Sequence, residues 1–396
     1  MGPTVKGDQT IFITTVTFLV FFCSFTGGQA LIYLVPRFRI ENLIIPAYIW
    51  TVLVAGISFI LFRYYEVFTW RRSLNISTIA VLSSVLNINT AVLLAKKEIG
   101  RYNILNVIPV FITMVGLTVG IFFYQSDSIY GYLYPLYGAY FISLVISFVY
   151  TRRYISISTS AGVFDDIDSA LKYGIGYQIF ELLQLLNFRL YFFLLYHLQG
   201  PSDLGVFSIG VSILEAVWIL GRSVFVIHYS DFSNSDDNIV AVRQTLRYIK
   251  VVFIISVILL TLIALCPTSV YGYVFGAPFA GIKYQVKWLF PGILMYSIAL
   301  VIQSIYLSRA RYGRLIFAQF VSLIISISLC YLWIPHYYYS GASAAASASY
   351  IVCAVIMLGF FMWDYGIPFS NLLISREDID FINNVLKSYA RRQKDS

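Results

Sequence analysis

Four ionisable residues lie inside long apolar stretches of the sequence, where a charge needs a partner. They are Glu181, Arg189, Glu215 and Arg222. A charged side chain at the centre of a bilayer costs about 2.5–3.5 kcal/mol on insertion scales, so such residues pair with one another or line a water-filled cavity. A guanidinium offers a fixed fork of donors that suits phosphate oxygens. A carboxylate in the same setting can take up H⁺ or Na⁺.

The first polar face is predicted on a helix over residues 171–196. At about 100° per residue, Gln178 and Arg189 lie within about 80° of Glu181, and Gln184 lies about 60° to the other side. An acid, a base and two amides therefore share one broad face of this helix.

The second polar face is predicted on the next helix, over residues 204–229. Glu215 and Arg222 are seven residues apart, so their directions differ by about 20°, and Ser208 and Ser212 fall on the same side. We expect both faces to line a central cavity between the two halves of the chain. There the arginines could hold a phosphate, and the amide and hydroxyl groups could bind neutral polar parts of the same ligand.

Two alternatives remain for these charges. The pairs Glu181 with Arg222, or Glu215 with Arg189, would only fasten helices together, and the arginines could also extend to the membrane surfaces. Cavity lining is the favoured interpretation. The predicted substrate-binding set is Arg189, Arg222, Glu181, Glu215, Gln178, Gln184 and Ser212.

Composition indicates a polytopic all-α membrane protein. Of 396 residues, 59% are hydrophobic and only 12% are charged, and the mean hydropathy is +0.79. Soluble domains carry about 25% charged residues. Eleven apolar stretches are long enough to cross a bilayer as helices: 10–35, 43–62, 75–95, 104–124, 130–150, 171–196, 204–229, 248–270, 286–307, 315–335 and 342–363.

The distribution of positive charge predicts the orientation of these spans. Loops on one side hold 19 of the 27 Lys and Arg residues, loops on the other side hold 6, and two lie within spans. The richer side faces the cytoplasm, so the C-terminus is expected there. The formal charge of +8 is then explained by the cytoplasmic loops, and nucleic acid is not an expected partner.

Two sequence patterns recur and indicate an internal repeat. The pattern GPxxxG occurs at residues 2–7 and 200–205, and a short basic link occurs at 96–101 and 309–314. Parallel repeats are an architecture of transporters. The expected domains are a five-span bundle over 1–150, a cytoplasmic linker over 151–170, a six-span bundle over 171–365 and a cytoplasmic tail over 366–396. The tail is expected to be either an amphipathic helix that lies on anionic lipid or a solvated segment.

Several motifs in this order resemble polysaccharide flippases of the O-antigen type. This family belongs to the multidrug/oligosaccharidyl-lipid/polysaccharide exporter (MOP) superfamily, which includes MATE multidrug exporters and lipid II flippases. The resemblance covers nearly the whole chain and rests on these segments: Gly2-Pro3, Gly28-Gln29-Ala30, Leu186 to Leu195, Gly200 to Gly210, and Ile334-Pro335 through Gly341-Ala342.

The sequence departs from the family pattern at three places. The family has one helix before the GP loop, so a further helix is expected before Met1, giving about 11 spans here instead of 12. A frequent Asp of the seventh helix is Tyr191, and the middle Gly of the late motif is Tyr338.

The resemblance implies two pseudo-symmetric helical bundles, as in MATE proteins. It implies transport of an undecaprenyl-diphosphate-linked oligosaccharide across the bacterial plasma (inner) membrane by alternating access, for O-antigen, capsule or exopolysaccharide synthesis. The implied partners are that lipid-linked oligosaccharide, membrane lipids, and the polymerase and other polysaccharide-assembly proteins. No cofactor is expected, and coupling to H⁺ or Na⁺ is an open option.

Two other functions remain as alternatives, a MATE-like small-molecule exporter and an O-antigen polymerase or membrane glycosyltransferase. The sequence contains no Walker loop, dinucleotide fingerprint, HExxH motif or nucleophile elbow, and its four Cys and three His lack the spacing of metal ligands. We therefore expect a transporter without catalytic residues or a metal site. The predicted external segment, about 270–286, has only Lys283 as a charged side chain, which disfavours a glycosyltransferase.

Overall fold

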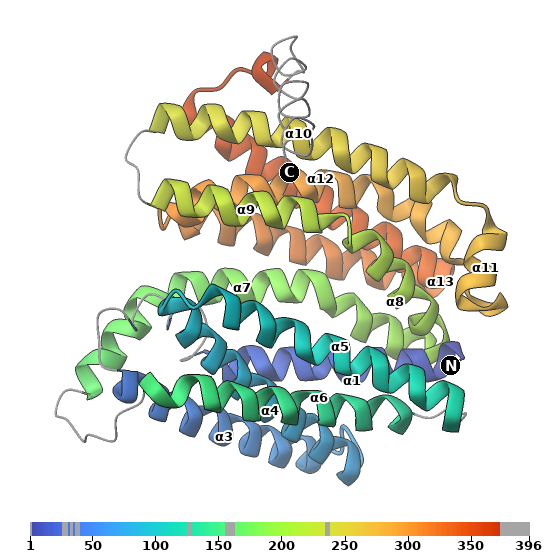
Figure 1. Cartoon of the computed structure of the whole chain (residues 1–396). Coiled ribbons are helices and arrows are strands. Elements are labelled where there is room, and N and C mark those ends of the chain that lie inside the picture. The colour runs from blue at the N-terminus through green and yellow to red at the C-terminus, as the bar shows by residue number, and fades with distance from the viewer. Residues whose placement is uncertain are drawn as a thin grey trace, which may run out of the picture. The chain divides into compact units, whose positions relative to one another are not determined.

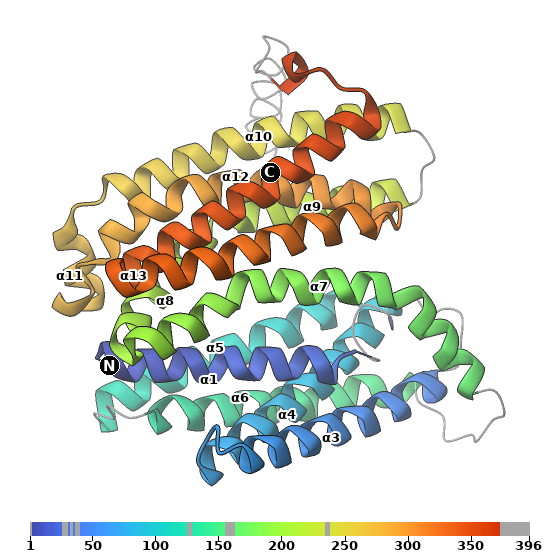
Figure 2. The same cartoon turned by 180° about the vertical axis from the view of Figure 1, so that it is seen from behind.

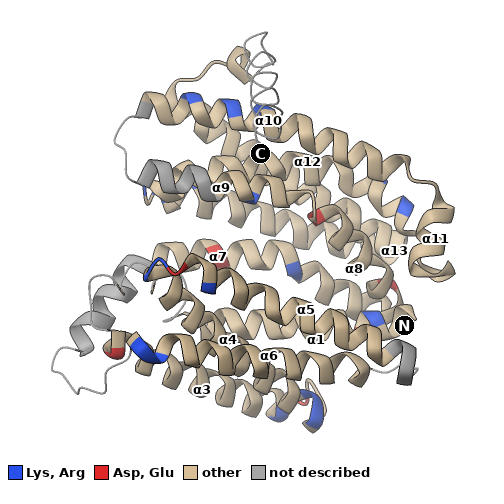
Figure 3. Ribbon diagram, in the orientation of Figure 1, with Lys and Arg blue, Asp and Glu red and all other residues tan. Residues whose placement is uncertain are grey.

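The protein is all-α over the part of the chain that the structure describes (Figures 1 and 2). The computed structural model describes residues 2–25, 31, 35, 40–124, 129–154, 163–233 and 238–372. Within these ranges, it describes the helical backbone but not the side chains of residues 121–124, 163–174, 226–233 and 238. Helices satisfy their backbone hydrogen bonds internally, as a bilayer requires. Charged residues are sparse along the ribbons, which are tan over most of their length in Figure 3.

The chain divides into two compact units, Met1–Gln178 and Ile179–Ser396, and the boundary falls inside α7. The helices of the first unit are α1 (Pro3–Cys23), α3 (Ile40–Tyr64), α4 (Trp70–Ala95), α5 (Ile99–Tyr124), α6 (Tyr130–Thr151), the 3-10 helix η1 (Arg152–Tyr154) and the start of α7 (Val163–Gln199). Those of the second unit are the rest of α7, α8 (Pro201–Glu215), α9 (Trp218–Ser233), α10 (Asn238–Leu265), α11 (Thr268–Phe275), η2 (Ala277–Phe279), α12 (Ile282–Ser308), α13 (Tyr312–Tyr365) and η3 (Phe369–Leu372).

Each unit is organised around one central helix. In the first unit α4 packs against α1, α3, α5 and α6, and Ile76 and Ile79 of α4 are buried against Phe12 and Leu136. In the second unit α12 packs against α8, α9, α10 and α13. These two helices are the most buried of the span candidates in the described chain, at 67% and 72% of their apolar windows. Each of these helices is thus the one around which its unit packs.

The internal repeat predicted from the sequence extends to the central helices and their turns. Adding 213 to the bounds of α4 gives residues 283 and 308, which lie at the two ends of α12. The link after each helix turns through a non-glycine residue with positive φ, Lys97 at 61° and Ala310 at 52°. Both links also make the same pair of backbone hydrogen bonds. The N–H of Lys97 or Ala310 donates to the carbonyl three residues earlier, and the N–H of the following residue donates to the carbonyl five residues before itself. The expectation of two pseudo-symmetric bundles is confirmed.

The two GP loops also correspond in structure. Pro3 opens α1 and Pro201 opens α8. Proline suits the first turn of a helix because its missing N–H would have no partner there, and its fixed φ matches the helix. The predicted first span, 10–35, differs from α1, which begins at Pro3 and ends at Cys23. The difference arises because the polar first turns that follow Pro3 are already helical.

The described helices account for the eleven expected spans. Nine helices are long and apolar enough to cross a membrane, and the bent pair formed by α8 and the first part of α9 makes a tenth candidate. The longest helix, α13, covers two expected spans, 315–335 and 342–363. The protein is therefore a multi-pass membrane protein.

The two halves of α13 form a hairpin whose arms meet at Tyr338 (Figure 2). Tyr338 has φ 53° and ψ −135°, which interrupts the helix at the position where the resembled family has its middle glycine. Three residues later Gly341 is required by close packing, because a Cβ there would lie 2.4 Å from the carbonyl oxygen of Trp333. The first arm is residues 312–337, and the second arm is residues 339–365.

The predicted bounds of the bundles, the linker and the tail stay predictions. Residues 155–162 of the linker and the C-terminal segment 373–396 lie outside the described residues, as do Gly28, Gln29 and Ala30.

Candidate functional site

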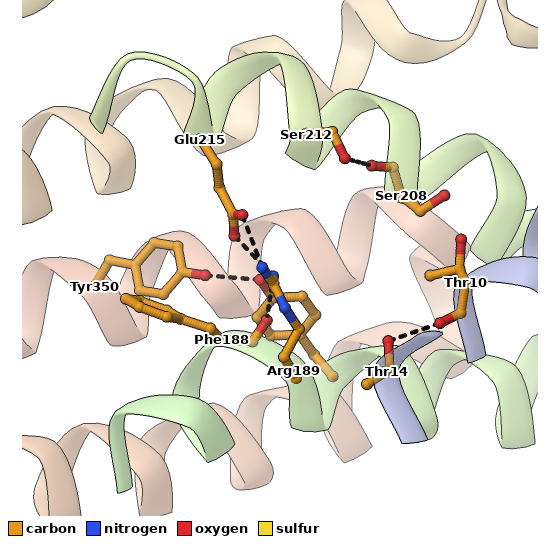
Figure 4. A network of polar contacts seen from close by, with 9 residues as sticks. Thr10, Thr14, Phe188, Arg189, Ser208, Ser212, Glu215 and Tyr350 are labelled. Carbon is orange, nitrogen blue, oxygen red and sulfur yellow. Dashed lines mark hydrogen bonds and ion pairs between the residues drawn. The ribbon is translucent and has the colours of Figure 1, made fainter. Parts of the chain in front are cut away.

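Arg189 of α7 and Glu215 of α8 form a two-pronged ion pair (Figure 4). Nη1 of Arg189 lies 3.0 Å from Oε1 of Glu215, and Nη2 lies 3.1 Å from Oε2. The side chains are 26% and 13% exposed, respectively. Nη1 also donates to the carbonyl of Phe188 at 3.0 Å, and the guanidinium lies 5.4 Å from the ring centre of Phe192. One of the two salt bridges that the sequence offered as alternatives is thus formed.

A break between α8 and α9 determines where Glu215 points. α8 ends at Glu215, α9 starts at Trp218, and the two axes are bent by 47°. The indole of Trp218 is buried and donates to the carbonyl of Ile293 on α12 at 3.0 Å, which anchors the start of α9. The span expected over 204–229 is therefore broken after Glu215, and the separation of about 20° between Glu215 and Arg222, which assumes a continuous helix, does not apply across this break.

An aromatic cluster packs beside the ion pair. It consists of Phe188, Trp218, Tyr296 and Tyr350, whose ring centres are 5.0–5.7 Å apart. The hydroxyl of Tyr350 lies 2.7 Å from that of Tyr191, the residue that replaces the family's Asp. Figure 4 shows the Tyr350 hydroxyl directed toward the Arg189 side of the pair. All four rings are buried, and charges attract one another more strongly in such apolar surroundings than in water.

A network of amides surrounds the hydroxyl of Tyr296. Gln184, Gln303 and Gln319 each donate to this oxygen, at 2.8, 3.1 and 2.9 Å, and Gln184 also donates to Oε1 of Gln303 at 3.1 Å. Asn187 extends the network by donating to Oε1 of Gln319 at 2.8 Å. Four of these five residues are buried, and Gln184 is half-buried. The predicted site residue Gln184 therefore joins α7 to α12.

The carbonyl end of Asn187 completes this network. Its Oδ1 accepts from Ser322 at 2.9 Å and from Ser349 at 3.2 Å, and these serines lie on opposite arms of α13. Buried polar groups are stable when hydrogen-bonded, and networks of this kind fix helix register. The amide network thus has a structural role in holding α7, α12 and α13 together.

The remaining predicted site residues are Ser212, Gln178, Glu181 and Arg222. Ser212 is exposed and donates to the carbonyl of Ser208 one turn earlier at 2.8 Å. Gln178 is buried and donates to the carbonyl of Phe25 at 3.4 Å, within the first unit. Glu181 is half-buried on α7. Arg222 is exposed, and no carboxylate among the described side chains pairs with it.

Two further ionic contacts were missed by the sequence analysis. Asp364, near the end of α13, accepts from Arg314 at 2.9 Å and from Tyr306 at 2.9 Å. In the first unit Glu98 accepts from the hydroxyl of Tyr154 at 2.8 Å and pairs with Arg153. The hydrogen bond from Tyr154 and the positive charge of Arg153 lower the pKa of Glu98.

The repeat offset gives a signal only for a neighbouring contact of Arg314, its packing on an aromatic ring. Arg101 lies 5.2 Å from the ring centre of Tyr150, and Arg314 lies 5.6 Å from that of Trp363. Both members of the second pair are 213 positions after those of the first. The contact is therefore repeated in both units, where an arginine of the basic link packs on an aromatic ring of the last helix.

The described residues contain no group of three or more His, Cys, Asp and Glu placed to hold a metal ion, and the four cysteines are free.

Solved structures of transporters resemble this chain along most of its length, whereas no family model and no curated protein matches its sequence. An inward-facing multidrug resistance MATE family transporter of the MOP superfamily has a TM-score of 0.71 and 12% identity, over 92% of this chain and 91% of that one. An outward-facing MATE family transporter has a TM-score of 0.63 and 16% identity, over 93% and 88%.

A third structure is a MOP superfamily transporter from Pyrococcus furiosus, with a TM-score of 0.62 and 13% identity over 92% of this chain and 89% of that one. It is described as having a binding pocket of reverse polarity that suggests a different function. At these identities the likeness establishes the fold, and the chain has the MATE-like fold of the MOP superfamily transporters.

Proposed function

We propose that this protein is a transporter that moves an undecaprenyl-diphosphate-linked oligosaccharide repeat unit across the bacterial plasma membrane by alternating access. The product would serve O-antigen, capsule or exopolysaccharide synthesis. The MATE-like fold supports this proposal, because similar structures include both inward-facing and outward-facing conformations. The observation that carries it is the Arg189–Glu215 ion pair on membrane-spanning helices of the second unit.

A diphosphate is the ligand that suits this ion pair. Its oxygens resemble the carboxylate of Glu215, so they can replace it as acceptors of the two Nη donors of Arg189. The exchange leaves the guanidinium paired throughout, which avoids the cost of an unpaired buried charge. The 26% exposure of the Arg189 side chain leaves it open to a ligand. Glu215, once released, and Glu181 are the carboxylates that we propose for H⁺ or Na⁺ uptake.

The sugar part of the substrate needs neutral hydrogen-bonding groups. Gln184 is half-buried on α7, three positions before Asn187, and Ser212 is exposed on α8, three positions before Glu215. Both are proposed to meet sugar hydroxyls, and Gln178 and Arg222 remain proposed members of the substrate-binding set. No cofactor is proposed. The proposed partners remain the lipid-linked oligosaccharide, membrane lipids and polysaccharide-assembly proteins.

A small-molecule exporter is the second candidate. It is favoured by the description of two similar structures as multidrug resistance transporters. A cationic drug needs an excess of acid in its site, whereas Glu215 is here neutralised by Arg189. A glycosyltransferase finds less support, because the ammonium group of Lys283 in the 270–286 segment donates to the carbonyl of Cys266 at 3.0 Å.

A strain lacking the gene distinguishes these functions. The proposal predicts that lipid-linked repeat units accumulate on the cytoplasmic face and that the wild-type gene restores polymer. Single repeat units displayed outside the cell would instead indicate a polymerase. Normal polymer together with increased sensitivity to cationic drugs would indicate an exporter, and either of these results contradicts the proposal.

A further inference from the structure

A cavity of about 660 Å³ lies at the open end of the α13 hairpin, within the second unit. It is formed by the first turns of the first arm and the last turns of the second arm. Its lining residues are Arg311, Gly313, Arg314, Phe317, Phe360 and Asp364. The cavity contains two guanidinium groups and one carboxylate, which gives it a net positive charge.

Arg314 is held rigidly at one wall of this cavity. Asp364 accepts from it at 2.9 Å, and the guanidinium lies 4.5 Å from the ring centre of Phe360 and 5.6 Å from that of Trp363. Asp364 is itself fixed, because its other oxygen accepts from the buried Tyr306 at 2.9 Å. Because the guanidinium is already ordered by these contacts, its unused N–H donors can bind a second acceptor, such as a ligand oxygen, with little further loss of side-chain entropy.

Arg311 and the backbone of the first arm supply the rest of an anion site. Arg311 directly precedes the helix and is exposed. The first N–H groups of the helix have no partner within it and carry a partial positive charge. Gly313 leaves these groups accessible, since a Cβ at this position would meet nothing within 4 Å. Two guanidiniums and an open helix start in one cavity form the donor set for a phosphate.

The cavity also has an apolar side. Phe317 is 53% exposed, and it packs edge-on against Phe360 with ring centres 5.8 Å apart. Phe317 lies within two turns of both arginines at the start of the first arm, and Phe360 lies one turn before Asp364 near the end of the second arm. Basic pockets between spanning helices at the cytoplasmic end suit lipid head groups. The acyl chain of a lipid would make apolar contacts with these rings, whereas a free phosphate ion would make none.

We propose that this cavity binds the phosphate group of an anionic membrane lipid, with Arg311 and Arg314 as its ligands and Phe317 against the start of the acyl chains. The site is separate from the Arg189–Glu215 pair and does not depend on the proposed function. The bound lipid would tie together the two ends of the hairpin at the membrane surface.

The test measures which lipids the full-length protein retains. Protein reconstituted in vesicles of phosphatidylcholine and phosphatidylglycerol in equal parts is extracted and examined by native mass spectrometry. Wild type is expected to retain phosphatidylglycerol in preference. Arg311→Gln should weaken this retention about tenfold, the factor expected for the loss of one charge-assisted hydrogen bond. Gly313→Leu, which fills the cavity without changing its charge, should weaken it as well.

One further variant serves as the matched control. Arg243→Gln removes an exposed guanidinium from α10, on the same predicted side of the membrane, and should leave retention unchanged. An equal loss for Arg243→Gln and Arg311→Gln, or unchanged retention in Gly313→Leu, would overturn the proposal. Displacement of the lipid by an equal concentration of inorganic phosphate would assign the site to a soluble anion and overturn the lipid assignment.

Discussion

The Arg189–Glu215 pair allows a quantitative prediction for a double-mutant cycle. Opposite unit charges about 4 Å apart attract by about 4 kcal/mol at an effective dielectric constant of about 20, and desolvation offsets part of this. The exposed fractions of 26% and 13% place the pair between surface pairs, worth about 0–1 kcal/mol, and buried pairs, whose disruption costs about 3–5 kcal/mol.

The two single variants should differ. Arg189→Gln leaves the more buried Glu215 unpaired, and we expect it to lower the free energy of unfolding by about 2–3 kcal/mol. Glu215→Gln should cost about 1–2 kcal/mol, because Arg189 keeps the Phe188 carbonyl and the Phe192 ring as partners. The double variant should cost no more than the milder single one, since two neutral amides remain and no charge is left unpaired.

Thermal unfolding of the purified variants, followed by tryptophan fluorescence, measures these changes. For a unit of this size, 1 kcal/mol corresponds to about 2–4 °C in the unfolding midpoint. Transport is then measured on the double variant, which should be folded and inactive if Arg189 holds the substrate phosphate. Additive stability effects within about 0.5 kcal/mol would refute the energetic coupling. Wild-type transport by the folded double variant would refute the role in binding.

Three further predictions concern the fold. Tyr338→Gly should raise the unfolding midpoint by the equivalent of about 1 kcal/mol, because φ 53° is unfavourable for tyrosine; an unchanged or lower midpoint would contradict this. Gly292→Leu should lower stability by about 3 kcal/mol or abolish folded protein in size-exclusion chromatography, because a Cβ there would lie 2.5 Å from the α13 backbone; a well-folded variant would show the helices to be less closely packed. The pKa of Glu98 is lowered chiefly by the hydrogen bond from the Tyr154 hydroxyl. The carboxylate should therefore stabilise the fold fully when the pH is above the usual glutamate pKa of 4.5. This contribution should be lost as the pH falls through the lower pKa that Glu98 has in the folded protein. The midpoints of wild type and Glu98→Gln should therefore converge in acid, and a constant difference at every pH would exclude this linkage.

Most of the helical architecture was predictable from the sequence, because long apolar stretches in lipid can only be helices. The repeat was predictable as well, since Gly-Pro loops and basic links recur in the same order. The bounds of the helices were less predictable. Hydropathy gave no sign that α1 starts at Pro3, ahead of the apolar stretch, or that Tyr338 would adopt a backbone conformation suited to glycine.

The candidate site was predictable only in part. Residue spacing indicated that Arg189 and Glu215 could pair, because both charges needed partners in the membrane. It gave no sign of the break after Glu215, where Trp218 makes a tertiary contact with α12, and so it compared Arg222 with Glu215 as if both lay on one continuous helix. Asp364 was missed because its partner Arg314 is 50 residues earlier and meets it only through the hairpin.

The most direct test of the central claim is a flipping assay with purified protein. A fluorescent undecaprenyl-diphosphate-linked oligosaccharide is placed in the vesicle membrane with the reconstituted protein, and a membrane-impermeant quencher reports its transfer between leaflets. The account predicts that wild type accelerates this transfer and that the Arg189→Gln/Glu215→Gln variant does not. Equal transfer rates in vesicles with and without wild-type protein, in a preparation that does export a cationic dye, would contradict it.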